Sequence, residues 1–201
     1  MKSIAIFASG NGTNFQAIVD RAASGILKVN IALLVVDNRR AFVFKRAQEA
    51  GIKTLFADPK KFKTKQEYEA FIIKHLEKDG VELVVLAGFM RILSPFFIKK
   101  YKNRILNIHP SILPAFSGKD AIKQALCYGV KVSGVTVHLV DEHVDHGPII
   151  AQESVTILGH EKIDELEAKI HEVEHKVYPE AIGRIVSTPF FVRGRKVIFE
   201  V

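Results

Sequence analysis

The sequence contains a single cysteine, Cys127, among 201 residues. One cysteine excludes an intrachain disulfide framework and a cysteine-rich zinc site, and it is typical of a chain from a reducing compartment. Cys127 stands near the end of a run that favours a helix, so we expect it to be a small, buried, hydrophobic side chain.

Long apolar runs are missing as well. No stretch approaches the roughly 20 apolar residues of a membrane-spanning helix, and the run Ile4–Ala8 is too short for the core of a signal peptide. We therefore predict a cytoplasmic protein without a membrane partner. Linkers rich in proline, glycine or serine, repeats and low-complexity segments are also lacking, which predicts one domain over residues 1–201. Within it we expect a nucleotide-binding-like half over about residues 1–100 and a catalytic half over about 101–201.

Positive charge is in excess, with a formal net charge of +7, but it is spread along the chain. The densest runs, Lys60–Lys65 and Lys99–Lys102, are interpreted as solvated helix faces, because nucleic-acid modules usually cluster their charge on one element. We expect no nucleic-acid partner. A basic balance is compatible with anionic small substrates.

Apolar, strand-like runs alternate with amphipathic, helix-like runs. The expected strands are Ile4–Ala8, Val29–Val36, Thr54–Ala57, Val81–Leu86, Arg104–Ile108, Lys131–Val140 and Ile149–Val155. The expected helices are Asn14–Ala23, Phe42–Ala50, Lys65–Glu77, Lys119–Tyr128 and Glu161–Ile185, and a terminal hairpin is expected over Phe190–Val201. The alternation predicts an α/β, Rossmann-like fold with a mostly parallel sheet and helices on both faces. Ligands of such folds bind beyond the carboxyl ends of the strands.

A glycine-containing turn, Ser9–Asn14, separates the first strand from the first helix. Glycine lets the backbone approach a ligand closely, and a helix N-terminus offers N–H groups and a positive dipole end. A phosphate is the natural ligand, although Phe15 replaces the third glycine of the dinucleotide fingerprint and no Walker loop is present. The alternative is a purely structural turn, capped by Thr13 or Asn14.

Two polar residues end the fifth expected strand. Asn107 and His109 lie on one face, because strand side chains alternate, and Pro110 stops the strand directly after them. An amide beside an imidazole can stabilise a developing oxyanion and move protons. The alternative for His109 is a hydrogen-bonded structural histidine.

The segment Asp141–Pro148 is acidic and rich in histidine. A carboxylate from this loop could pair with His109 and raise the pKa of its imidazole. The alternatives are a solvated acidic loop and a metal site, since His138, His143 and His146 crowd near two aspartates, but no recognisable ligand spacing supports a metal.

The segment Leu86–Pro95 follows a buried strand and offers apolar walls, exposed backbone and the cation Arg91. Such a pocket suits a flat aromatic ligand with a carboxylate tail. The alternative is ordinary core with a surface arginine.

Together these segments resemble the folate-dependent formyltransferases, in particular the phosphoribosylglycinamide formyltransferases of purine synthesis. The motifs that carry the resemblance are Ser-Gly-Asn-Gly-Thr-Asn at 9–14, Leu-Ala-Gly-Phe-Met-Arg-Ile-Leu-Ser at 86–94, Asn-Ile-His-Pro-Ser at 107–111, Val-Asp-His-Gly-Pro-Ile-Ile at 144–150 and Glu-His-Lys-Val-Tyr-Pro at 174–179. They occur in the family's order and span nearly the whole chain.

The resemblance implies two small-molecule substrates, 10-formyltetrahydrofolate and 5-phosphoribosylglycinamide, and no metal. It assigns Gly12, Thr13 and Asn14, with His171 and Glu174, to the ribonucleotide and its phosphate. It assigns the folate to Lys65, Met90, Arg91, Ile92, Leu93, Asn107, Asp141, Glu142, His143, Val144 and Asp145. It leaves open whether the chain is a monomer or a homodimer.

The resemblance also implies the chemistry: the glycyl amine attacks the formyl carbon, Asn107 donates to the oxyanion, and His109 and Asp145 handle charge and protons. The nearest alternative is a hydrolase that releases formate from the same folate, whose relatives carry an additional N-terminal domain. A transfer-RNA formyltransferase would need a C-terminal RNA-binding domain. A non-catalytic nucleotide-binding module and a metal-dependent hydrolase are the remaining classes.

Overall fold

The computed structural model describes residues 1–200, which form two compact units, residues 1–106 (unit 1) and residues 107–200 (unit 2). No helix among these 200 residues is both long enough and apolar enough to cross a membrane. The expectation of a single domain with a boundary near residue 100 stays a prediction.

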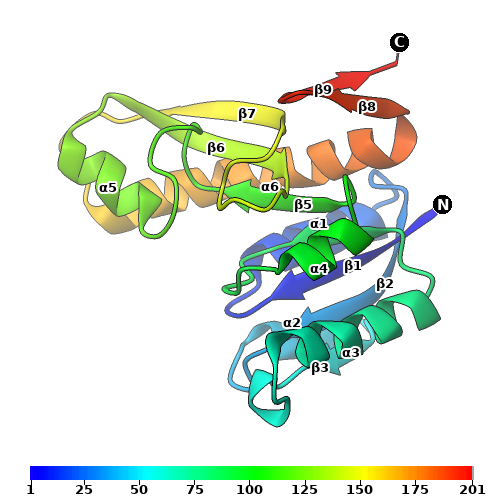
Figure 1. The fold of residues 1–201 in the computed structure, drawn as a ribbon. Helices are drawn as coiled ribbons and strands as arrows, with labels where there is room; N and C mark the ends of the chain where they lie inside the picture. The colour runs from blue at the N-terminus through cyan, green and yellow to red at the C-terminus, as the bar shows by residue number, and fades with distance from the viewer. Residues whose placement is uncertain (201) are drawn as a thin grey trace. The chain divides into compact units, whose positions relative to one another are not determined.

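Unit 1 contains a parallel sheet in the order β3-β2-β1-β4 (Figure 1). Its strands are β1 (Lys2–Ala8), β2 (Val29–Val36), β3 (Thr54–Phe56) and β4 (Leu83–Leu86). Its helices are α1 (Thr13–Ala23), α2 (Val43–Glu49), α3 (Lys65–Lys78), α4 (Pro95–Lys100) and the 3-10 turn η1 (Pro59–Lys61). All of β4 and the second halves of β1 and β2 are buried. Continuous burial is typical of parallel strands that are covered on both faces.

Unit 2 contains mixed pairing, in the order β5-β6-β7-β9-β8. Its strands are β5 (Ile105–His109, whose first two residues fall in unit 1), β6 (Val132–Leu139), β7 (Ile149–Thr156), β8 (Phe190–Arg193) and β9 (Lys196–Phe199). Strands β6 and β7 are antiparallel, β7 and β9 parallel, and β8 and β9 antiparallel. Helix α5 (Ala121–Tyr128) precedes β6, and the long helix α6 (Ile163–Ser187) packs along β6 and β7 (Figure 1).

The predicted α/β fold is confirmed, and the observed ends of the predicted elements lie within two residues of their expected positions. The terminal hairpin is present, although Val201 lies outside the described residues. The sequence did not predict α4 and η1, which are short and begin with a proline in their first turn. In β6, the alternation suggested two distinct faces, but all residues from Ser133 to Leu139 are buried because neighbouring elements cover both.

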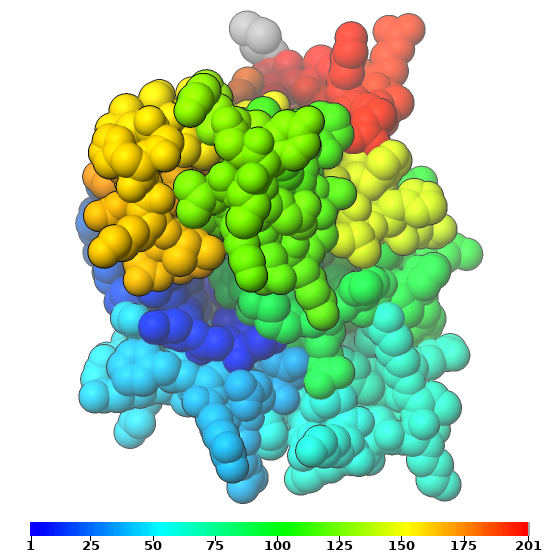
Figure 2. Space-filling model, turned by 90° about the vertical axis from the view of Figure 1, so that its left-hand side faces the viewer, coloured from blue at the N-terminus to red at the C-terminus, as the bar shows by residue number. Residues whose placement is uncertain are grey.

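The expectation for Cys127 is wrong, because its side chain is exposed. Helix α5 buries Ala121, Ile122 and Ala125, positions that share one face of a helix. Cys127 lies on the opposite face, and α5 forms part of the surface of unit 2, in bright green in Figure 2.

Candidate active site

Strand β5 supplies the first two residues of the candidate site. Asn107 and His109 lie two positions apart in it, and the strand ends at His109, as expected from Pro110. Asn107 is half-buried and His109 is buried. Their position at the carboxyl end of a strand is where ligands bind in α/β folds.

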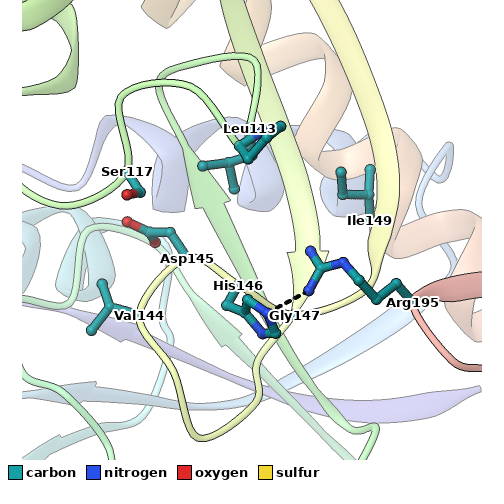
Figure 3. A pocket seen from close by; sticks show the side chains of 9 residues that line it. Leu113, Ser117, Val144, Asp145, His146, Gly147, Ile149 and Arg195 are labelled. Atoms are coloured by element: carbon teal, nitrogen blue, oxygen red, sulfur yellow. Dashed lines mark hydrogen bonds between the residues drawn. The ribbon is translucent and has the colours of Figure 1, made fainter.

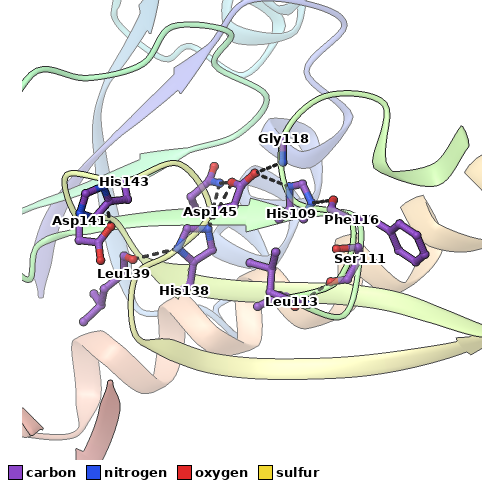
Figure 4. A network of polar contacts seen from close by, with 12 residues as sticks. His109, Ser111, Leu113, Phe116, Gly118, His138, Leu139, Asp141, His143 and Asp145 are labelled. Atoms are coloured by element: carbon purple, nitrogen blue, oxygen red, sulfur yellow. Dashed lines mark hydrogen bonds and ion pairs between the residues drawn. The ribbon is translucent and has the colours of Figure 1, made fainter. Parts of the chain in front are cut away.

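His109 has an acceptor beside each ring nitrogen (Figure 4). Its Nδ1 lies 3.2 Å from Oδ2 of Asp145, and its Nε2 donates to the carbonyl oxygen of Phe116 at 2.8 Å. A carboxylate and a carbonyl oxygen can only accept hydrogen bonds. The surroundings therefore suit an imidazole that carries hydrogen on both nitrogens.

Asp145 is fixed from three sides in unit 2. Besides its contact with His109, its carboxylate accepts the N–H of Gly118 at 2.8 Å and lies 3.5 Å from Nδ2 of Asn107. The Asp145 backbone has φ 50°, and Phe116 and Asp120 have φ 53° and 57°. Left-handed backbone at residues other than glycine costs free energy and is concentrated at functional sites. Three such residues in the loops around His109 thus support its functional interpretation.

His138, on β6, orients the amide of Asn107. Its Nδ1 donates to the carbonyl oxygen of Leu139 at 2.9 Å, which leaves Nε2 to accept from Nδ2 of Asn107 at 3.2 Å (Figure 4). Burial lowers the pKa of His138, although the Leu139 carbonyl and Asp145 act in the opposite direction, so the ring is neutral near neutral pH. The neutral ring fixes the amide so that its NH₂ group faces the site.

Sequence reasoning missed this role and placed His138 only among possible metal ligands. The available signal was that His138 is a polar residue on one face of a strand, a face that it shares with Thr136. This strand, β6, lies next to β5, which carries Asn107. Within residues 1–200, no three histidine, cysteine, aspartate or glutamate side chains come together in a way that could hold a metal ion.

The loop after β6 folds back on itself. Asp141 accepts the N–H of His143 at 3.0 Å and a hydrogen bond from Nδ1 of His146 at 2.7 Å. Partial burial by itself would raise the pKa of Asp141, but these hydrogen bonds lower it overall. Gly147 closes the loop, because a Cβ at this position would lie 1.8 Å from the carbonyl oxygen of Leu139. Next to the loop lies a pocket of about 460 Å³, with Asp145, His146, Leu113 and Ser117 in its wall (Figure 3).

Helix α6 carries His171 and Glu174, which pair with each other. Nδ1 of His171 lies 2.8 Å from Oε2 of Glu174, a buried carboxylate. This hydrogen bond raises the pKa of His171, while partial burial opposes the shift. The pair is thus able to present a cation to an anionic ligand.

In unit 1, the turn between β1 and α1 is shaped by the backbone. Gly12 has φ 78°, and a Cβ added to it would lie 2.4 Å from Cγ2 of Val43, so only glycine fits. Arg46 holds the turn from α2, through hydrogen bonds of 2.9 Å to the carbonyl oxygen and to Oδ1 of Asn11. The interpretation of Thr13 or Asn14 as the helix cap is wrong: the N-cap is Gly12, without a side-chain hydrogen bond, and Thr13 begins the helix. Its N-terminal N–H groups remain suited to an anion.

The segment after β4 meets this turn within unit 1. Ser9 donates its N–H to the carbonyl oxygen of Gly88 at 3.1 Å, and its Oγ accepts the N–H of Met90 at 2.9 Å. The buried carboxylate of Glu69, on α3, accepts the N–H of Ser94 at 2.8 Å and also its hydroxyl. Sequence reasoning missed Glu69, because a charged residue amid a helical apolar stripe gave no sign of its partner.

The predicted folate residues of unit 1 differ in environment. Met90 is 80% and Ile92 is 66% exposed, whereas Leu93 is buried core. Exposed large apolar side chains are typical of a binding surface. Nε of Arg91 lies 2.6 Å from Oδ2 of the nearly buried Asp37, so one edge of its guanidinium is already engaged. Lys65 is exposed at the start of α3.

The structure therefore brings Asn107, His109 and Asp145 together in unit 2, in the same unit as His171, Glu174 and the segment Asp141–Asp145. The remaining predicted residues, Gly12–Asn14, Lys65 and Met90–Leu93, lie in unit 1.

Residues 2–182 match the family model described as formyl transferase. The chain is 46% identical over 186 residues to the phosphoribosylglycinamide formyltransferase of Bacillus subtilis, an alignment that covers 92% of this chain and 95% of that protein.

Two solved structures are similar to the whole fold. The glycinamide ribonucleotide transformylase 1 of Symbiobacterium toebii is 41% identical with a TM-score of 0.96, and the match covers 99% of this chain and 94% of that one. The enzyme of the same name from Geobacillus kaustophilus is 46% identical with a TM-score of 0.91, over 93% of this chain and all of that one.

Proposed function

Since the chain belongs to the formyl transferase family, we propose that it is a phosphoribosylglycinamide formyltransferase. It transfers the formyl group of 10-formyltetrahydrofolate to the glycyl amine of 5-phosphoribosylglycinamide, a step of purine biosynthesis. The carrying observation is the cluster of Asn107, His109 and Asp145, whose contacts of 3.2 and 3.5 Å join an amide, an imidazole and a carboxylate at the carboxyl end of β5.

In this proposal the amine nitrogen attacks the formyl carbon, whose oxygen becomes negatively charged. Asn107 donates a hydrogen bond to that oxygen. One of its two N–H groups is held by His138, and the other faces Asp145 at 3.5 Å, at the upper limit of a hydrogen bond. The second N–H is therefore only weakly engaged and is available to a closer and more negative acceptor in the transition state, where it stabilises most.

His109 and Asp145 carry the protons. The carboxylate of Asp145, directly or through a water molecule, takes the proton that the attacking amine loses. His109 supplies a proton to the folate nitrogen as the bond between that nitrogen and the formyl carbon breaks. Proton delivery requires that the Nε2–H of His109 first breaks its hydrogen bond to the carbonyl oxygen of Phe116. Hydrogen bonds of this kind commonly rearrange when substrate binds. The amine loses one proton and the folate nitrogen gains one, and transfer of a proton from Asp145 back to His109 restores both groups, so the reaction needs no other reactant.

Each substrate is assigned to residues of suitable chemistry. The ribonucleotide phosphate binds to the N–H groups at Gly12, Thr13 and Asn14, with His171 and Glu174 toward the ribonucleotide. The folate ring system contacts Met90, Ile92 and Leu93 and the loop Asp141–Asp145. Lys65 and Arg91 bind the acidic tail of the folate. Asp37 orients Arg91 through its contact with Nε, which leaves the terminal NH₂ groups of the guanidinium to donate to a carboxylate.

The test mixes purified protein with 10-formyltetrahydrofolate, with and without phosphoribosylglycinamide, and follows folate absorbance. Release of tetrahydrofolate that depends on the ribonucleotide supports the proposal. Release at the same rate without the ribonucleotide would instead identify a hydrolase, and no release in either mixture would contradict both.

A further inference from the structure

An arginine from the C-terminal hairpin contacts the loop that carries Asp145. Arg195 lies in the turn between β8 and β9, beyond residues 2–182 that match the family model. Its Nη1 is 2.8 Å from Nε2 of His146 (Figure 3), and Nδ1 of His146 is 2.7 Å from Oδ2 of Asp141. The three side chains thus form one chain of hydrogen bonds.

The chemistry of the three groups fixes the direction of this chain. A guanidinium can only donate, so Nε2 of His146 must accept. The ring hydrogen is then on Nδ1, where it is donated to the carboxylate of Asp141, an acceptor only. The chain of hydrogen bonds therefore begins at a cation that can only donate, Arg195, and ends at an anion that can only accept, Asp141. His146 thereby bridges the two charged groups.

The bridge spans the loop on which the proposed chemistry depends. Asp141 stands at the beginning of this loop and His146 at its end, with the four residues Glu142–Asp145 between them. These four residues belong to no helix or strand. They are held by contacts that include the hydrogen bond from the N–H of His143 to Asp141 and the contact of Asp145 with His109. Joining Asp141 to His146 therefore closes the loop, and Arg195 ties the closed loop to the hairpin.

We propose that Arg195 is a positioning residue, which acts through His146 and Asp141 to hold the segment Asp141–Val144 in the conformation that receives the folate. The inference rests on the proposed function, because it assigns that segment to the folate. The carboxylate of Asp145 has its own anchors, at Gly118 and His109. Loss of Arg195 consequently weakens folate binding and leaves the chemical step nearly intact.

The kinetic test compares Arg195→Ala with Arg193→Ala. The Arg193→Ala control removes the same charge from the same hairpin, and Arg193 forms no ion pair with any other residue among residues 1–200. We expect Arg195→Ala to raise the KM for 10-formyltetrahydrofolate about fivefold, the size of one lost net hydrogen bond, with kcat and the KM for the ribonucleotide changed less than twofold. Arg193→Ala should match the wild type. An unchanged folate KM in Arg195→Ala, or equal effects of both variants, overturns the proposal.

A double variant tests the route through His146. His146→Ala should raise the folate KM by a similar factor, and Arg195→Ala with His146→Ala should raise it no further than either change alone. Multiplied effects would mean that the two residues act independently, which contradicts the proposed chain of contacts.

Hydrogen exchange separates this inference from the proposed function, because it requires no activity. In the substrate-free protein, amides of Asp141–Val144 should exchange several-fold faster in Arg195→Ala than in the wild type, and at the wild-type rate in Arg193→Ala. Equal rates in all three proteins would overturn the bracing role even if the protein transfers formyl groups. Faster exchange in a protein without transferase activity would support the brace and contradict only the function.

Discussion

The candidate sites of the two units are built by different means. In unit 1, the turn at Gly12 depends on backbone geometry, because φ is 78° and Val43 occupies the space of a Cβ. In unit 2, Asn107, His109 and Asp145 depend on one another's side chains and on His138. Backbone N–H groups suit an anion that stays unchanged, whereas interlocked side chains suit a reaction in which charge and protons move. This contrast predicts that changes at the Gly12 turn affect binding, whereas changes within the cluster of Asn107, His109 and Asp145 affect turnover.

The largest effect is expected from His109→Ala. Removing a general acid–base group typically lowers turnover about 10²- to 10⁴-fold. Both KM values should change little, because most of the proposed contacts of the two substrates are with residues other than His109. Steady-state kinetics with both substrates varied measures this, and circular dichroism controls for folding of the buried site. Full turnover in the folded variant would remove His109 from the mechanism.

A smaller effect, on binding, is expected from Gly12→Ala. The left-handed backbone and the clash with Val43 should displace the turn and raise the KM for the ribonucleotide about tenfold, equivalent to a strain of roughly 1–2 kcal/mol. Gly10→Ala is the matched control, since a Cβ there meets nothing within 4 Å. If both variants bind the ribonucleotide equally well, the turn does not hold the phosphate.

His138→Phe tests the orientation of Asn107. Phenylalanine keeps an aromatic ring at this position but has no nitrogen to accept the hydrogen bond from the Asn107 amide, so that amide is less well placed as a donor. We expect kcat to fall roughly fivefold, as for one misplaced hydrogen bond, without a change in either KM. Combined with Asn107→Ala, the change at His138 should have no further effect; an additional loss would show that His138 acts by another route.

The smallest effect is a pH dependence from His171. Its pKa is raised by Glu174, so the ring is a cation below its pKa in the folded protein and loses that charge as pH rises through it. Affinity for a phosphate should therefore fall as pH increases, by about threefold, the scale of a half-exposed ion pair. Ribose 5-phosphate, which lacks the glycyl amine, measures this as a competitive inhibitor, at pH values above 7 where its phosphate is mostly the dianion.

Two variants control the pH test. His171→Asn should flatten the dependence, and Glu174→Gln should move it to lower pH because the stabilising carboxylate charge is gone. If the wild type and His171→Asn show the same pH dependence, His171 does not contact the phosphate.

Elements that depend on local pattern were predicted well from the sequence. Apolar runs, glycine and proline located β1, β2, β5 and α6 within two residues, and residue spacing placed Asn107 and His109 on one strand face. The motifs that resemble formyltransferases predicted the family, which the comparisons confirm.

Long-range partners could not be predicted in this way. Nothing adjacent in the sequence indicates that His138 lies 3.2 Å from Asn107, that Glu69 binds Ser94 or that Arg195 reaches His146. The exposure of Cys127 likewise depended on which face of α5 found a neighbour.

The sequence by itself thus determined the alternation of strands and helices, the position of the glycine-containing turn Ser9–Asn14, and the residue types available for chemistry. These follow from backbone sterics and from the periodicity of apolar residues, which act over a few positions. Only the tertiary structure decided how the Asn107 amide faces and what holds Asp145. Those properties arise from contacts between residues 27 to 38 positions apart, which form only when the strands and loops have packed.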